Sequence, residues 1–126
     1  ACTHAGGGHA ANLSLSIANS CNSYYADVFR KALDNPAYNS VETGLLKWKE
    51  YMSGFGLGHR LGVDLPGEKA GYIPDTTRFN NPKIFGKNRW NSCTIASLGI
   101  GQGEMQTTPL QMANAVCLIA NKGWYY

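Results

Sequence analysis

Residues 100–113 read Ile-Gly-Gln-Gly-Glu-Met-Gln-Thr-Thr-Pro-Leu-Gln-Met-Ala, and this stretch carries the clearest helix start in the chain. Thr108 and Gln111 have the spacing of a capping box, in which each side chain accepts a hydrogen bond from the other residue's backbone N–H. Pro109 suits the first helical position because its missing N–H is not needed there. The apolar pattern continues through Ile119, and residues 121–123, Asn-Lys-Gly, stop it. The sequence therefore predicts a helix that begins directly after Thr108.

Glycines precede this helix at positions 99, 101 and 103. The segment lacks the lysine of a phosphate-binding loop, so we interpret these glycines as points of close backbone packing. A second glycine-rich segment, residues 54–58, follows a helical pattern rather than a strand and indicates a flexible helix exit. Residues 94–100 are predicted to form a short strand.

Two helical patterns lie upstream. Residues 40–55 place apolar side chains at steps of three and four, with Ser40 suited to the N-cap. Residues 12–33 show similar spacing, but a polar cluster at residues 19–23 predicts a break between two helices. Residues 59–92 are rich in turn formers and predict extended pieces joined by turns. The apolar positions are Ile17, Cys21, Tyr24, Val28 and Leu33 in the first pattern, and Val41, Leu45, Trp48, Met52 and Phe55 in the second.

Composition indicates a folded chain, and the length of residues 1–126 suits one small domain or part of a larger one. Apolar residues make up 44% of the chain and charged residues 15%, which is too little charge for a disordered tail. The net charge of +3 is spread along the sequence, so no nucleic-acid partner is expected, and no apolar run is long enough to span a membrane. Cys117 lies in an apolar helical run and is predicted to be a buried thiol. The expected fold class is mainly α with long loops and no sheet of its own.

Ser20-Cys21-Asn22 stands inside the polar interruption of the first helical pattern. A hydroxyl and a carboxamide at such a break can both point into a cleft, which makes Ser20 and Asn22 candidate catalytic residues. Serine and asparagine also favour helix caps, so a purely structural pair of capping residues is the alternative interpretation.

Two cysteines and two histidines offer a second functional possibility. Two sulfurs and two nitrogens suit tetrahedral zinc, although the spacing of these residues matches no standard zinc finger. A small zinc-binding structural module is therefore an alternative function, and no other cofactor is expected. The candidate ligands are Cys2, His4, His9 and Cys21.

Three ordered blocks of the sequence carry a family resemblance. Residues 12–25 resemble the segment around the second catalytic motif of class B penicillin-binding proteins. Residues 55–74, with Phe-Gly-Leu-Gly, Gly-Val-Asp-Leu-Pro-Gly-Glu and Gly-Tyr-Ile-Pro, resemble the stretch that follows it, and residues 100–113 resemble a later signature of the same proteins. The type that the chain resembles is penicillin-binding protein 2, the elongation-specific enzyme.

The resemblance implies the helical subdomain portion of an α/β transpeptidase fold related to serine β-lactamases. It implies a peptidoglycan D,D-transpeptidase that cross-links stem peptides through a serine acyl-enzyme and is the target of β-lactams. Ser20 would then relay a proton and Asn22 would hold the substrate amide. No serine of the chain has a lysine three residues later, and no Lys-Thr-Gly or Lys-Ser-Gly occurs, so the resemblance implies an inactive internal fragment. A piece of a serine β-lactamase is the further alternative, which the block at residues 100–113 disfavours.

The same resemblance implies partners and a location for the parent protein. Its substrates would be stem peptides, its inhibitors β-lactams, and its protein partners the cell-wall elongation machinery. The parent would be anchored in the bacterial inner membrane and face the periplasm, while the fragment itself is expected to be soluble. Apolar surface that a missing sheet leaves uncovered predicts self-association of the fragment, with the stripe from Val41 to Phe55 as one candidate surface.

Overall fold

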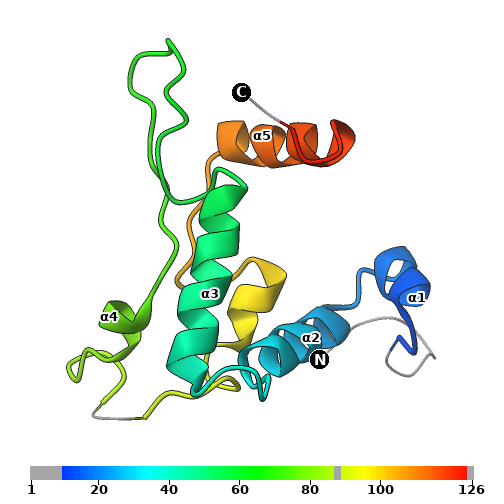
Figure 1. Cartoon of the computed structure of the whole chain (residues 1–126), viewed down its shortest axis with the longest axis vertical. Helices are drawn as coiled ribbons and strands as arrows, with labels where there is room; N and C mark the ends of the chain where they lie inside the picture. The colour runs from blue at the N-terminus through cyan, green and yellow to red at the C-terminus, as the bar shows by residue number, and fades with distance from the viewer. Residues whose placement is uncertain (1–9, 87–88, 125–126) are drawn as a thin grey trace. The chain divides into compact units, whose positions relative to one another are not determined.

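The computed structural model of the chain describes residues 10–86 and 89–124 and is mainly helical (Figure 1). Within these residues, strand pairing is limited to an isolated antiparallel bridge between Tyr72 and Gln106. Helices with long connecting loops therefore form the fold, as the sequence predicts. In chain order the helices are α1 (Leu13–Ala18), α2 (Asn22–Leu33), α3 (Val41–Gly54), α4 (Thr76–Phe79), the 3₁₀ helix η1 (Ala96–Ile100) and α5 (Pro109–Ala120).

The described residues divide into two compact units. The first contains those of Ala1–Gly44 and Arg89–Gly103, and the second those of Leu45–Asn88 and Glu104–Tyr126. Each unit therefore combines two separate stretches of the sequence. No helix in the described part of the chain is both long and apolar enough to cross a membrane.

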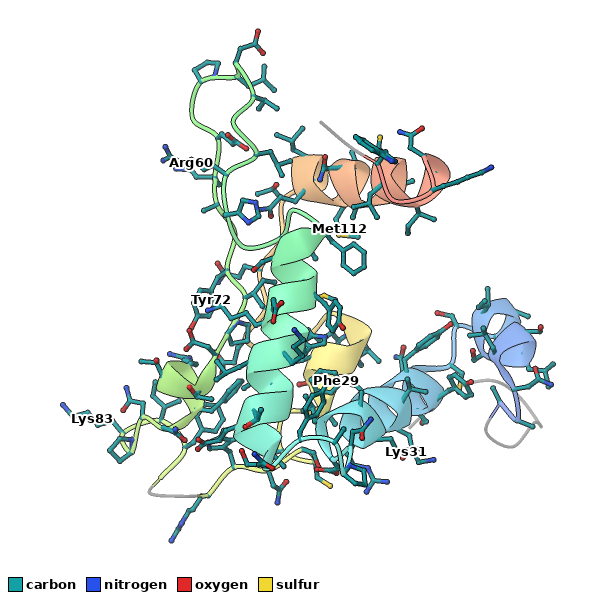
Figure 2. All side chains as sticks on the ribbon, in the orientation of Figure 1. Phe29, Lys31, Arg60, Tyr72, Lys83 and Met112 are labelled. Atoms are coloured by element: carbon teal, nitrogen blue, oxygen red, sulfur yellow. The ribbon has the colours of Figure 1, made fainter. Side chains whose placement is uncertain are left out.

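The first unit is built on the packing of η1 against α2. Phe29 is buried on α2 (Figure 2), and Gly99 of η1 comes so close that a Cβ there would lie 2.4 Å from the Phe29 Cβ. Atoms of this kind cannot approach closer than about 3.5 Å without repulsion, so only glycine fits at position 99. The predicted close packing around these glycines is confirmed. Ile95 and Leu98 complete the buried surface on the η1 side.

The predicted strand at residues 94–100 is wrong, because the structure has the 3₁₀ helix Ala96–Ile100 there. A strand needs a neighbouring strand to satisfy its backbone groups, and the described residues around this segment supply none. The tight helix instead satisfies its groups locally. It ends at Gly101, whose φ of 69° few other residues adopt readily.

The predicted apolar stripe of residues 17–33 is only partly correct. Leu33 and Cys21 are buried, but Ile17 is 65% exposed and Val28 48% exposed. The stripe assumes one continuous helical register, whereas α1 ends at Ala18 and α2 begins again at Asn22. The turn between the two helices resets the direction of every side chain that follows it. The predicted break is therefore confirmed, and it explains why the stripe fails.

The second unit contains most of α3 and a long loop at residues 59–71. Leu45 is fully buried and its stripe partners on α3 are half-buried, whereas Leu46 and Tyr51 on the other side are exposed. The α3 stripe therefore faces the interior, which removes it as the first choice for a self-association surface. Ser40 accepts a hydrogen bond from the Thr43 backbone N–H at 3.2 Å, which confirms it as a cap of α3.

Figure 1 shows residues 59–71 as a two-armed loop, and Figure 2 places Arg60 on it. Gln111 of α5 fastens both ends of this loop. Its Nε2 donates to the carbonyl oxygens of His59 at 2.7 Å and Ala70 at 2.8 Å, and its side chain is almost fully buried. Glu68 also joins the two arms of the loop, because its carboxylate accepts a hydrogen bond from the backbone N–H of Leu61 at 2.5 Å. A loop held in this way has little conformational freedom at its base.

The capping box of α5 is present as predicted. The Gln111 N–H donates to the Thr108 hydroxyl at 3.2 Å, and the Thr108 N–H donates to Gln111 Oε1 at 3.0 Å. Cys117, predicted to be buried, is exposed instead. Met112, Val116 and Ile119 are also exposed within the described residues. An apolar composition predicts that a helix has a partner, but it does not say whether that partner lies in the same stretch of chain.

Replacing Thr108 with alanine should destabilise the protein by about 0.5–2 kcal/mol, because it removes the acceptor for the Gln111 N–H at the helix start. Thermal and denaturant unfolding measure the change. Thr107→Ala is the matched control, because Thr107 is exposed and precedes the cap, so its replacement should be close to neutral. Equal stability of Thr108→Ala and wild type would contradict the role of the cap.

Candidate active site

Ser20 lies in the turn between α1 and α2, with its backbone in the left-handed region at φ 47°. The Ser20 N–H donates to the Ile17 carbonyl at 3.2 Å, and the Cys21 N–H donates to the Ser16 carbonyl at 2.9 Å. This pair of bonds is a Schellman motif, in which a left-handed residue terminates a helix. Ser20 therefore occupies the position that glycine usually fills.

The same pair of bonds ends α3, η1 and α5, which shows what is unusual about Ser20. Glycine holds the left-handed position at Gly56 after α3 and at Gly101 after η1. Among the described residues, the non-glycine residues with positive φ are Ser20 and Lys122, the latter at the end of α5. A side chain in this conformation costs on the order of 1 kcal/mol, and such strain gathers at functional sites.

The three residues of the Ser20–Asn22 segment alternate in exposure. Cys21 is fully buried, whereas Ser20 and Asn22 are exposed. Neither Ser20 nor Asn22 makes a side-chain hydrogen bond within the described part of the chain. The N-cap of α2 is Cys21, which forms no side-chain cap bond. The Ser20 hydroxyl and the Asn22 carboxamide are thus available to a ligand. A residue that serves as a helix cap would instead use its side chain to bond the helix backbone.

A polar contact joins the two helices on either side of this turn. Ser16 is fully buried on α1, and its hydroxyl donates to the Leu13 carbonyl at 2.7 Å. The Ser16 Oγ also lies 3.3 Å from the Tyr25 hydroxyl on α2, within hydrogen-bonding distance. Sequence reasoning misses Ser16 and Tyr25. Nothing in the local sequence distinguishes Ser16 from the exposed residues of α1, or Tyr25 from the neighbouring Tyr24, so their contact cannot be predicted.

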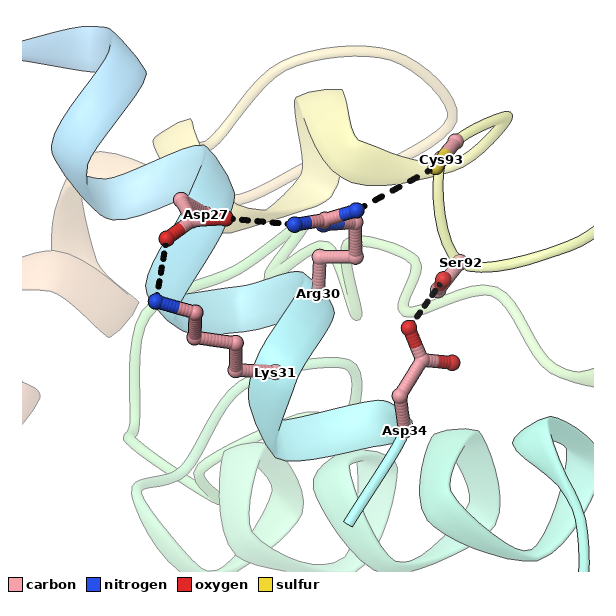
Figure 3. Close-up of polar contacts among 6 residues, drawn as sticks. All are labelled: Asp27, Arg30, Lys31, Asp34, Ser92 and Cys93. Atoms are coloured by element: carbon pink, nitrogen blue, oxygen red, sulfur yellow. Dashed lines mark hydrogen bonds and ion pairs between the residues drawn. The ribbon is translucent and has the colours of Figure 1, made fainter.

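Charged side chains gather on α2 at Asp27, Arg30 and Lys31 (Figure 3). Asp27 pairs with Lys31 at 2.8 Å and with Arg30 at 2.8 Å. The hydrogen bond from Lys31, and then the one from Arg30, lowers the pKa of the Asp27 carboxyl. All three groups remain partly solvated, so these pairs contribute little to stability. They are a surface network and not part of the candidate site.

Two further contacts in Figure 3 tie the residues before η1 to α2. The buried Ser92 hydroxyl donates to Asp34 Oδ2 at 2.6 Å, and Arg30 donates to the Cys93 sulfur at 3.9 Å. Asp34 is the C-cap residue of α2. These contacts hold the distant stretch of chain that carries η1 against the helix that begins with Asn22.

Within the described residues, no three His, Cys, Asp or Glu side chains come together as a metal site requires. Three of the four predicted zinc ligands, Cys2, His4 and His9, lie outside the described residues. The fourth, Cys21, is buried next to Ser20 and Asn22. The predicted zinc site therefore stays a prediction.

The family model of the penicillin-binding protein transpeptidase domain matches residues 3–126. The chain belongs to this transpeptidase family. Its helices match the solved structure of Pseudomonas aeruginosa penicillin-binding protein 2 in complex with WCK 5153, with a TM-score of 0.68 and 30% identity. That match covers 89% of this chain and 22% of the other, and it confirms the expected fold, a helical portion of a transpeptidase domain.

Curated relatives give the same family. Escherichia coli (strain K12) peptidoglycan D,D-transpeptidase MrdA is 37% identical over 84 residues, which cover 67% of this chain and 13% of the relative. Bacillus subtilis penicillin-binding protein H is 43% identical over 83 residues, or 66% of this chain and 10% of the relative. Mycobacterium tuberculosis PbpB is 38% identical over 67% of this chain and 11% of its own length. The matched part of the chain thus spans about a tenth to an eighth of the length of these relatives.

Proposed function

We propose that this chain is part of a peptidoglycan D,D-transpeptidase that cross-links stem peptides through a serine acyl-enzyme and is inhibited by β-lactams. Ser20 and Asn22 are the residues that it contributes to the catalytic site. The observation that carries this assignment is the strained turn, which holds both side chains exposed and without partners in the described chain. Strain of this kind gathers at functional sites, so it supports a functional role for two exposed side chains without partners in the described chain.

The proposed reaction needs a nucleophile that this sequence does not contain. A serine supplied from outside residues 1–126 attacks the carbonyl of the penultimate D-alanine, and an ester forms as the bond to the terminal D-alanine breaks. The departing amine must gain a proton, and the Ser20 hydroxyl can pass one to it while accepting another. The Asn22 carboxamide carries both a donor and an acceptor, which match the two sides of a peptide group. An amine of a second stem peptide then resolves the ester.

Location and partners follow the proposed function. The whole protein is anchored in the bacterial inner membrane, faces the periplasm and works with the cell-wall elongation machinery. The isolated chain associates with itself, and the exposed apolar residues of α5 now replace the α3 stripe as the surface for this association. The similarity of this chain to relatives named peptidoglycan D,D-transpeptidase MrdA supports the enzyme class.

Two other functions remain as alternatives to be tested. A zinc-binding structural module would contain stoichiometric zinc, which elemental analysis of the purified chain detects. A serine β-lactamase piece would belong to a protein that hydrolyses penicillin rapidly instead of remaining acylated. The family match over residues 3–126 favours the transpeptidase over both.

A fluorescent penicillin should label the full-length protein covalently but leave the 126-residue chain unlabelled. The reason is that none of the eight serines in the chain has the lysine three residues on that activates the family's nucleophile. Intact-mass measurement and in-gel fluorescence read the result on equal amounts of both proteins. A stoichiometric adduct on the 126-residue chain would contradict the proposed division of roles. An unlabelled full-length protein would contradict the function itself.

A further inference from the structure

We infer that Tyr25 and Ser16 are positioning residues for the Ser20–Asn22 turn, a conclusion that rests on the proposed function. The turn carries the two exposed side chains, and it joins α1 to α2 through a few residues only. Its geometry therefore depends on how the last turn of α1 and the first turn of α2 are held together. The Ser16–Tyr25 contact is a side-chain hydrogen bond that links these two helices across the turn.

Ser16 acts on the turn from the α1 side. Its carbonyl accepts the Cys21 N–H at 2.9 Å, and this bond closes the Schellman motif around Ser20. Its hydroxyl is buried with the Leu13 carbonyl and the Tyr25 hydroxyl as partners. Backbone and side chain of one fully buried residue thus fix both the fold of the turn and its attachment to α2.

Tyr25 holds the turn from the α2 side, and η1 packs against Tyr25 in turn. Its backbone N–H donates to the Cys21 carbonyl at 3.3 Å, one residue after Ser20. The carbonyl oxygen of Tyr25 lies close to Gly99, and a Cβ added at Gly99 would lie 3.0 Å from this oxygen. The close packing of η1 on α2 therefore fixes the position of Tyr25. The hydrogen bond between the Tyr25 and Ser16 hydroxyls then fixes the position of Ser16 relative to α2. This chain of contacts connects the glycine segment before residue 103 to the turn that carries Ser20.

The consequence is that loss of the Tyr25 hydroxyl should misplace Ser20 without removing any group that touches the substrate. Displacements of about 1 Å at reacting groups cost on the order of 100-fold in rate. Tyr25→Phe keeps the ring, its edge-to-face contact with Tyr24 and the helix, so the protein should fold normally. We expect acylation by a fluorescent penicillin to slow by about 10- to 100-fold in this variant of the full-length protein.

The matched control is Tyr24→Phe, which removes the neighbouring hydroxyl and should leave acylation unchanged. Ser16→Ala removes the other side of the contact and should slow acylation to a similar degree. The decisive measurement is a double-mutant cycle with Ser20→Ala. If Tyr25 acts through Ser20, then Tyr25→Phe should add almost nothing to the loss that Ser20→Ala already causes.

Each outcome has a separate meaning. A wild-type acylation rate in Tyr25→Phe together with a slow Ser20→Ala would overturn this inference and leave the proposed function intact. Losses that multiply in the double variant would also overturn it, because Tyr25 would then act independently of Ser20. Wild-type rates in Ser20→Ala itself would remove the proposed role of the turn, and the inference with it.

Discussion

Replacing Ser20 with glycine should stabilise the protein and at the same time slow its acylation by a β-lactam by about 10²- to 10⁴-fold, the usual contribution of a positioned proton-transfer group. The two effects have different causes. Glycine relieves the left-handed strain at φ 47°, which is worth up to about 1 kcal/mol at such a position. The substitution also removes the hydroxyl that we propose as the proton relay. Thermal unfolding and acylation rate should be measured on the same preparation of the full-length protein.

Lys122→Gly is the matched control for the effect on stability. Lys122 has a φ of 56° in the Schellman motif that ends α5, so glycine relieves the same strain there. This variant should gain a similar stability and keep the wild-type acylation rate. Ser20→Ala is the matched control for chemistry, because it removes the hydroxyl and keeps a side chain at the strained position. It should be as slow as Ser20→Gly without the gain in stability.

Asn22→Ala belongs to the same test, because the loss of its amide should weaken acylation by removing a hydrogen bond to the substrate. If the two residues served only the structure, Ser20→Gly would acylate at the wild-type rate or faster. That result, with the expected rise in melting temperature, would end the catalytic assignment of the turn. A fall in stability on Ser20→Gly would instead show that the serine side chain supports the fold.

Replacing Gln111 with glutamate should destabilise the protein by about 3 kcal/mol or more at neutral pH, since a buried carboxylate that faces two carbonyl oxygens is costly even though its other oxygen still accepts the Thr108 N–H. Gln111 is 1% exposed, and its Nε2 donates to the carbonyl oxygens of His59 and Ala70. A carboxylate of the same shape turns both attractive contacts into repulsion between oxygens. The loop at residues 59–71 would lose its fastening to α5 as a result.

The cost should depend on pH in a definite direction. Burial beside two carbonyl oxygens raises the pKa of the introduced carboxyl above its unfolded value of about 4.3. The penalty is therefore full above the raised folded pKa and shrinks as the pH falls through it, because the protonated acid can donate to one carbonyl. The difference in melting temperature between variant and wild type should narrow at acidic pH.

Gln106→Glu makes the same chemical change at an exposed glutamine of the same unit and should be nearly neutral. Gln111→Ala removes the contacts without adding a charge, so its cost should lie between those of the other two variants and should show little dependence on pH. A Gln111→Glu protein as stable as wild type at neutral pH would show that the bonds to the loop are not important.

Some features of this protein are determined by local sequence alone. Thr108, Pro109 and Gln111 specify the start of α5 because their bonds close within one helical turn. Ser40 specifies the start of α3 for the same reason, and the polar residues 19–23 indicate a break because residues of these types are unfavourable in a helix interior. The family can also be identified from the sequence, because it depends on ordered motifs and not on packing.

Other features are decided by the tertiary structure. The segment before Gly101 forms a 3₁₀ helix rather than a strand because the described residues around it supply no neighbouring strand, and its Gly99 packs on Phe29, a residue 70 positions earlier. The left-handed backbone of Ser20 follows from the way α1 ends, and no residue type marks it, since glycine would be the expected choice. The second bond partners of Gln111 lie 41 and 52 residues away. Contacts between distant residues have no local pattern, and for that reason the sequence predicts where the helices begin but not how the turn that carries Ser20 is held.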